Sequence, residues 1–384
     1  MEKKFIAIMI FTLLLLLVAL GVRIATGPGI NFNSDGGFNL TLPEFGGLFN
    51  DAGNRETQGD IAANNDDRFV LNMRLSSPHP MNDGGTMAME WAVHEIYYRT
   101  NGAINITHFP SGQLGDEDTV REGAKSGNID IVVVSLPVAF DNRIGILFLP
   151  HFATCYEDGL NMWTYGSNTF AILSEVVEEQ NLKLMGILPG GLHGIGTYSP
   201  FNPETVWDFD QPSHELIIRI FPAWIFETIA DAKQLRVKEI ESRSELRDAF
   251  FAGTVDGWMG GSPHENSVNY HHLINYFYDF KTVAFFRNVL MNKDTYYLIP
   301  EEYRQIIFEV MQEASVQAIN ARATLSAGAL QVMTTFHGIT VITPTDEERQ
   351  QMREAMSRRL WPKFVKEFEV DQYVFERVLQ DIRY

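Results

Sequence analysis

The segment from Thr100 to Ser135 constrains the fold of this chain more than any other part of the sequence. Ile104 to His108 alternate between apolar and polar side chains, which is typical of a half-buried strand. After a loop containing proline and glycine, carboxylates at 116–118 open a predicted helix, where they complement its positive end. The apolar run from Ile129 to Val134 then predicts a strand buried on both faces. Strand, helix and strand in succession predict an α/β unit.

The rest of the chain continues this alternation of strands and helices. A long helix is predicted from Pro300 to about His337, ended by Gly338, and Thr345 with Glu348 forms a capping box for the helix after it. The remaining predicted helices cover 87–99, 156–181 and 242–252, and the remaining predicted strands cover 69–75, 182–187, 216–221, 254–259, 296–299 and 338–343.

Composition narrows the class of protein. A chain of 384 residues with 45% hydrophobic and 21% charged residues is long enough for a large two-domain core. Its formal charge of −19 argues against a nucleic-acid partner, because phosphates require a basic surface. The single cysteine, Cys155, excludes an internal disulfide and a cysteine-based zinc site.

The N-terminal segment indicates export. Lys3 and Lys4 precede an uncharged apolar run from Phe5 to Val22. This run is longer than the roughly 7–15 residues of a signal-peptide core and reaches the roughly 17–25 residues of a membrane-spanning helix. We expect residues 1–23 to be a signal peptide or a membrane anchor, with the retained anchor favoured, and 24–67 to be a flexible linker. The protein would then face the periplasm, tethered to the inner membrane.

The amino-acid sequence of the first α/β unit resembles that of a known protein family. TNGAINITHFPSGQLGDE, followed by GAKSGNIDIVVVS, resembles the DctP-like substrate-binding subunits of TRAP transporters, the tripartite ATP-independent periplasmic systems. The resemblance implies an α/β fold of the two-lobed periplasmic binding protein type, with a ligand cleft between the lobes and one long helix spanning both. It also implies that the chain crosses between the lobes more than once. The expected lobes are 68–190 plus 287–327, and 191–286 plus 328–384.

The same resemblance implies a function without catalysis. Such a protein captures an organic acid and delivers it to integral membrane permease subunits. We expect a monomer without a cofactor and without metal-ligating residues of its own, and the sequence leaves open whether a metal ion accompanies the ligand. A periplasmic ligand sensor of the same fold is an alternative. A periplasmic enzyme is less favoured, because the sequence shows no motif with a nucleophile and a base or with clustered acids.

Arg219 is the first candidate ligand-binding residue. It interrupts the apolar strand LIIRIF, where a cation is costly without a partner. A guanidinium that faces the cleft offers two parallel donors to a carboxylate. Arg219 matches the arginine of a K-x-R-V strand that does this in the TRAP subunits. The alternative is an arginine paired with a structural carboxylate.

Four other residues are weaker candidates. His193 lies in GGLHG where relatives commonly have G-x-R, and its charge would depend on pH. Trp258 and Met259 replace polar residues of the family segment V-D-G-Q-E-N-P, which suggests a ligand with a larger apolar body than a short dicarboxylate. Ser135 follows the buried strand, where the family places a residue facing the cleft. Each could instead be an ordinary loop or core residue.

Overall fold

A computed structural model describes residues 69–382 apart from positions 82, 209, 212 and 214, together with two short antiparallel strands, β1 (Asn31–Phe32) and β2 (Phe38–Asn39). These two strands belong to a separate unit, 1–59, and the rest of the fold to a unit of residues 60–384. The expected anchor at 1–23, and the expected linker at 24–67 apart from β1 and β2, lie outside the described residues. Within the described residues, no helix has both the length and the apolar character needed to span a membrane.

The first sheet of the larger unit has five strands in the order β4-β3-β5-β12-β6. β3 pairs in parallel with β4 and with β5, whereas β12 runs antiparallel to both β5 and β6. The five strands are β3 (Leu71–Ser76), β4 (Ile104–Phe109), β5 (Ile131–Val134), β6 (Leu182–Leu192) and β12 (Ala284–Asn292).

Both faces of this sheet are covered by helices. Successive residues of β5 point to opposite faces, so Ile131 and Val133 join one apolar core while Val132 and Val134 join another. α2 (Gly84–Arg99) and α10 (Glu301–Phe336) contribute to the first core. The second core includes residues of α3 (Glu117–Ser126), α4 (Tyr156–Met162) and α5 (Asn168–Glu178). Short 3-10 helices, η1 (Val138–Phe140) and η2 (Asn142–Phe148), follow β5.

The second sheet has six strands in the order β13-β11-β7-β10-β8-β9. β10, β8 and β9 are parallel neighbours, and Arg219 of β8 lies between Trp258 of β10 and Lys238 of β9. The strands are β7 (Ile195–Thr197), β8 (Ile217–Ile220), β9 (Arg236–Glu239), β10 (Gly257–Met259), β11 (Tyr276–Tyr278) and β13 (Thr340–Ile342). Its helices are α6 (Trp224–Ala232), α7 (Arg243–Phe251) and α8 (Pro263–Asn269).

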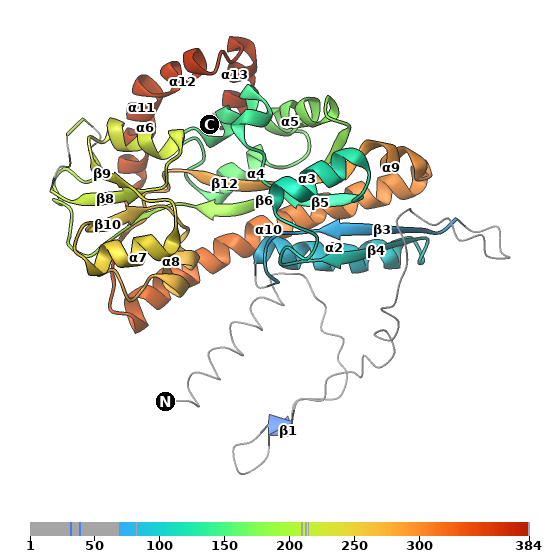
Figure 1. The fold of residues 1–384 in the computed structure, drawn as a ribbon, viewed down its shortest axis with the longest axis horizontal. Helices are drawn as coiled ribbons and strands as arrows, with labels where there is room; N and C mark the ends of the chain where they lie inside the picture. Colours follow the sequence, from blue (N-terminus) through green and yellow to red (C-terminus); the bar gives the residue numbers. More distant parts are fainter. Residues whose placement is uncertain are drawn as a thin grey trace. The chain divides into compact units, whose positions relative to one another are not determined.

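Between β6 and β13 the chain passes between the two sheets three times. β6 leads directly into β7, and β11 leads back into β12. These two connections are hydrogen-bonded to each other, since the His193 amide donates to the Val283 carbonyl (3.0 Å) and the Thr282 amide donates to the His193 carbonyl (2.9 Å). α10 makes the third passage: Val310 belongs to the core of the first sheet and Met333 to that of the second. Figure 1 shows this helix running alongside both sheets, as expected for a two-lobed fold with a helix common to both lobes.

The C-terminal helices return to the first sheet. These are α11 (Asp346–Arg359), α12 (Trp361–Glu367) and α13 (Gln372–Leu379), followed by η3 (Gln380–Ile382). α13 contacts α5, and Asp381 accepts hydrogen bonds from the amides of Asn168 and Thr169 at the start of α5. The expected lobe boundaries, which assign 328–384 to the second lobe, remain a prediction.

Several predicted elements are confirmed. The helix from Pro300 to about His337 is α10, and the capping box of Thr345 and Glu348 begins α11. The predicted strands at 69–75, 182–187, 216–221 and 338–343 correspond to β3, β6, β8 and β13.

Two predictions of elements were wrong. The helix expected over 156–181 is two helices, because the Ser167 side chain caps a new helix by accepting from the Phe170 amide. The strand expected at 296–299 lies in α9 (Lys293–Leu298) and the residue after it. There the Asn292 side chain accepts from the Thr295 amide, and this cap overrides the β-favouring tyrosines.

Candidate ligand-binding site

A cavity of about 380 Å³ lies at the carboxyl ends of the parallel strands β8, β9 and β10. Open α/β sheets bind ligands at this edge, because loops and side chains converge there. We call it the polar cavity. It is lined by Gly190, His193, Arg219, Phe221, Phe226, Glu241, Leu246, Trp258, Met259, Gly260, Gly261, Glu265, Tyr270, Phe285 and Arg287. Since Gly190, Phe285 and Arg287 come from β6 and β12, both sheets contribute to its wall.

The turn after β10 lets the backbone form part of this wall. Gly260 and Gly261 both have positive φ angles, 128° and 74°, which side-chain-bearing residues rarely adopt. A Cβ on Gly261 would also lie 2.9 Å from the Nδ2 of Asn266, which donates to the carbonyls of this turn. The turn therefore favours glycine at both positions.

Arg219 is positioned by main-chain carbonyls. Its Nε donates to the Ile240 carbonyl at 2.7 Å and its Nη2 to the Glu241 carbonyl at 3.1 Å, both just after β9. The residue is only 8% exposed, yet it lines the cavity, and its Cζ lies 5.8 Å from the centre of the Phe221 ring. These carbonyls satisfy part of the guanidinium, so its burial does not by itself require an anionic ligand. Its position in the cavity wall is the stronger argument for binding.

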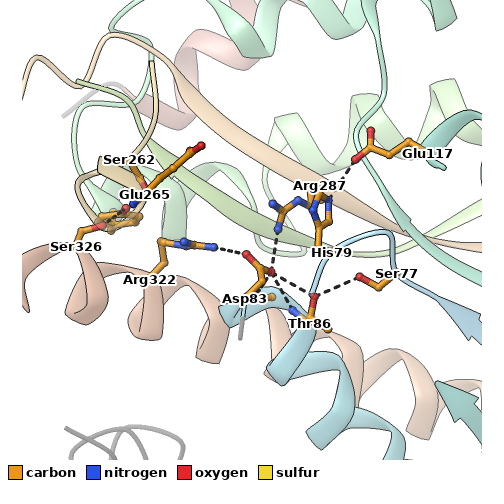
Figure 2. Close-up of polar contacts among 12 residues, drawn as sticks. Ser77, His79, Asp83, Thr86, Glu117, Ser262, Glu265, Arg287, Arg322 and Ser326 are labelled. Atoms are coloured by element: carbon orange, nitrogen blue, oxygen red, sulfur yellow. Dashed lines mark hydrogen bonds and ion pairs between the residues drawn. The ribbon is translucent and has the colours of Figure 1, made fainter. Parts of the chain in front are cut away.

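Arg287 reaches the cavity from the other sheet and belongs to a buried ionic cluster. Asp83 accepts from Arg287 Nη1 at 3.0 Å and from Arg322 Nη2 at 2.6 Å, and it also caps α2 by accepting from the amides of Gly85 and Thr86. Figure 2 shows the two guanidinium groups approaching this one carboxylate. Burial raises the pKa of Asp83, but the charges of Arg287 and Arg322 outweigh burial and lower it to about 2. The cluster therefore carries two positive charges and one negative charge.

His193 occupies the crossing between the sheets. Its ring stacks on Phe285 with centroids 4.9 Å apart and faces Phe226 at 6.3 Å. Burial, and then the nearby charge of Arg322, lowers the pKa of His193 to about 4. The ring is consequently neutral at neutral pH, and it gives the cavity an aromatic wall with a polar edge.

Trp258 and Met259 line the cavity but belong mainly to the core. Trp258 is 2% exposed and packs against Tyr270 at 4.6 Å and Phe250 at 5.5 Å between ring centroids. Met259 is 1% exposed and belongs to the core on the other side of the strand. Little of either surface is left for a ligand, and their role in binding remains a prediction.

Ser135 lies apart from the other four candidates. It lines a second cavity of about 460 Å³, next to the residues that follow β5. Arg219, His193, Trp258 and Met259 are thus brought together in one cavity, and Ser135 is in its neighbour.

Sequence reasoning missed Arg287, Phe285, Glu241 and Glu265 in the cavity wall. Arg287 had the same signal as Arg219, a cation inside an apolar run, here AFFRNVLMN. Glu241 follows the strand β9, and Glu265 lies in the first turn of the short helix α8. Both are in polar segments, so no sequence pattern indicated that they line a cavity. Within the described part of the chain, no three histidine, cysteine, aspartate or glutamate residues converge in a way that could hold a metal ion.

These features define a two-lobed α/β binding protein with its site between two sheets. Residues 77–367 match the family described as bacterial extracellular solute-binding protein, family 7. The chain belongs to this family, whose members bind and transport solutes and are not catalysts.

Solved structures of TRAP periplasmic solute-binding proteins share the fold. One from Rhodobacter sphaeroides, in an apo open state, is 18% identical, with a TM-score of 0.70 over 81% of this chain and 98% of that one. One from Chromohalobacter salexigens with bound D-glucuronate is 17% identical, with a TM-score of 0.64 over 81% and 98%. The ectoine-binding protein of the TeaABC TRAP transporter of Halomonas elongata is 19% identical, with a TM-score of 0.65 over 81% and 99%.

Proposed function

We propose that this protein captures an organic carboxylate outside the cytoplasm and delivers it to TRAP-type membrane permease subunits. The observation that carries the proposal is the placement of two arginines, Arg219 and Arg287, in the wall of the polar cavity of a protein with a formal charge of −19. An acidic protein repels anions in general, so it requires a local positive site to bind one. Arg219 lies on one side of the cavity and Arg287 on the other.

The electrostatics of the described residues support an anionic ligand. The group formed by Asp83, Arg287 and Arg322 has an excess positive charge, and the charge of Arg322 is, after burial, the second cause of the lowered pKa of His193 in the cavity wall. Glu241 and Glu265 in the same wall offer acceptors for hydroxyl or ammonium groups of the ligand. Relatives of the same fold include proteins with bound D-glucuronate, L-gulonate and orotic acid, which are all organic acids.

The protein would act without catalysis, as a monomer and without cofactor. Closure of the lobes over the ligand needs only a higher affinity of the closed state for the ligand.

Calorimetric titration of the purified protein tests the proposal. Each acid is compared with its primary amide: D-glucuronate with D-glucuronamide, and 4-phenylbutyrate with 4-phenylbutyramide. We expect saturable binding of at least one acid and at least about 30-fold weaker binding of its amide, because the amide loses the charge-assisted pair with arginine. Equal affinity for acid and amide would contradict carboxylate recognition. Loss of cellular uptake of the bound acid on deletion of the gene would support transport, and unchanged uptake would favour a sensor.

A further inference from the structure

The polar cavity adjoins the second cavity of about 460 Å³, which we call the apolar cavity. Phe221, Phe226 and Phe285 line both cavities, so a single layer of side chains separates them. Both volumes lie in the range of small-molecule pockets, roughly 300–1,000 Å³. The two cavities are therefore adjacent compartments that share three phenylalanines.

Phenylalanine dominates the apolar cavity. Its polar or charged lining residues are Glu117, Asp118, Arg121 and Ser135, and six phenylalanines make up much of the remaining wall. The phenylalanines are Phe148, Phe221, Phe226, Phe285, Phe364 and Phe368. Phe148 and Phe285 meet edge to face at 5.8 Å between centroids, an arrangement that aromatic rings favour. A wall of this kind favours an apolar occupant and offers a polar one few hydrogen-bond partners.

Phe221 connects the two compartments. It is 39% exposed, although a large apolar side chain in a cavity wall gains free energy when it is covered. The guanidinium carbon of Arg219 lies 5.8 Å from the centre of its ring. A carboxylate held by Arg219 would therefore lie close to Phe221, a side chain that also lines the apolar cavity.

We propose that the ligand is an amphipathic carboxylic acid, with its carboxylate in the polar cavity at Arg219 and an alkyl or aryl body that crosses Phe221 into the apolar cavity. The inference rests on the proposed function, because it specifies the class of acid that this site takes. It also assigns the apolar part of the ligand to the phenylalanines, in place of Trp258, whose ring is 2% exposed.

A homologous series of acids tests the inference on the full protein. Affinity is measured by calorimetry for straight-chain acids from butanoate to decanoate, and for phenylacetate and 4-phenylbutyrate. Burial of each methylene group should raise affinity about fourfold until the apolar cavity is full. A negative heat-capacity change that grows with chain length should accompany the gain. The aryl acids show whether the cavity prefers rings to chains.

A matched pair of variants tests whether the alkyl chain of the acid occupies the apolar cavity. Val138 is half-buried in the wall of the apolar cavity, and Val138→Trp should fill part of it. We expect decanoate to bind at least about tenfold more weakly to this variant, with butanoate changed by less than about twofold. Val268→Trp makes the same substitution at a 57% exposed position on α8 that lines neither cavity, and it should change neither affinity.

The possible results separate the two proposals. If acids bind, but affinity is independent of chain length or highest for polyhydroxy acids such as D-glucuronate, the apolar compartment takes no part of the ligand and only this inference fails. If no acid binds, the proposed function fails as well. The series on the unmodified protein decides between these results even if Val138→Trp does not fold.

Discussion

The arginines of the two sheets are held in different ways. Arg219 of β8 is oriented by the carbonyls of Ile240 and Glu241, which carry no net charge. Arg287 of β12 is oriented by the carboxylate of Asp83, which it shares with Arg322. Carbonyl groups fix a guanidinium without cancelling its charge, whereas a carboxylate does both. Because Arg219 itself lines the polar cavity and Asp83 does not, we expect substitutions at Arg219 to alter mainly binding, and substitutions at Asp83 mainly stability.

Substitution of Arg219 should have the largest effect on affinity. Removal of one partner of a buried charge pair costs about 2–5 kcal/mol, so Arg219→Ala should weaken acid binding by about 30-fold to several thousand-fold. Arg219→Lys keeps the charge but loses the fork of donors, and it should also weaken binding clearly. Calorimetry measures both variants.

The control for Arg219 is the stability of the ligand-free protein. Loss of the two bonds to main-chain carbonyls should lower the melting temperature of both variants. A binding loss that disappears when titrations are performed well below the melting temperature would reduce Arg219 to a structural role. Arg358→Ala, which removes an arginine with a 68% exposed side chain, should leave affinity unchanged.

His193, which is half-buried in the wall of the polar cavity, should make stability depend on pH. Its pKa is about 4 in the folded protein against 6.5 in the unfolded chain, so the unfolded chain binds the proton first as pH falls. Its contribution is fully present above pH 6.5 and is lost as pH falls to 4, by roughly 3 kcal/mol. Urea unfolding of His193→Gln should show a correspondingly smaller loss over this window. An identical pH profile in the variant and the unmodified protein would contradict the burial of a neutral ring.

Asp83 should affect stability at lower pH. Its pKa is lowered from 3.8 to about 2, so the stability that it contributes is present above pH 4 and is lost as pH falls to 2, by roughly 2.5 kcal/mol. Asp83→Asn keeps an amide oxygen that can cap α2 but removes the charge. Urea unfolding between pH 5 and pH 2 should show a flatter profile for this variant, with lower stability at neutral pH. A profile as steep as that of the unmodified protein would assign the acid sensitivity to other carboxylates.

Arg287 should have the smallest effect on binding, because its charge is shared with Asp83. We expect Arg287→Gln to weaken acid binding by less than about tenfold, since the glutamine amide can still donate to Asp83. Calorimetry on the same acids as for Arg219 checks this value. A loss equal to that of Arg219→Ala would show that both sheets anchor the carboxylate, and the contrast between the two arginines would be wrong.

Local patterns predicted much of the fold. The buried strand β5, the helix α10 and the capping box of α11 follow from apolar periodicity and end signals within a few residues. β9 could not be found in this way, because all four of its residues are exposed and it is mostly polar. Its strand conformation comes from pairing with β8.

Local sequence patterns likewise predicted only part of the candidate site. Arg219 was detectable because a cation inside an apolar strand conflicts with its surroundings. Asp83 was not, since its role depends on Arg287 and Arg322, which are distant in the sequence and meet it only in the folded protein. The phenylalanines of the apolar cavity resemble ordinary core residues in the sequence, and only their arrangement around a cavity distinguishes them.

The antiparallel strand β12 has a consequence for how the protein folds. β6 hydrogen-bonds within its sheet to β12 alone, and all of β7 to β11 is synthesised between these two strands. The strand β6, which has eleven residues, therefore has both edges unpaired while most strands of the second sheet are synthesised. Pairings this distant in sequence form slowly and expose chains to aggregation. The first sheet is complete only once β12 has been synthesised, so we expect β6 to lack its pairing strand until then.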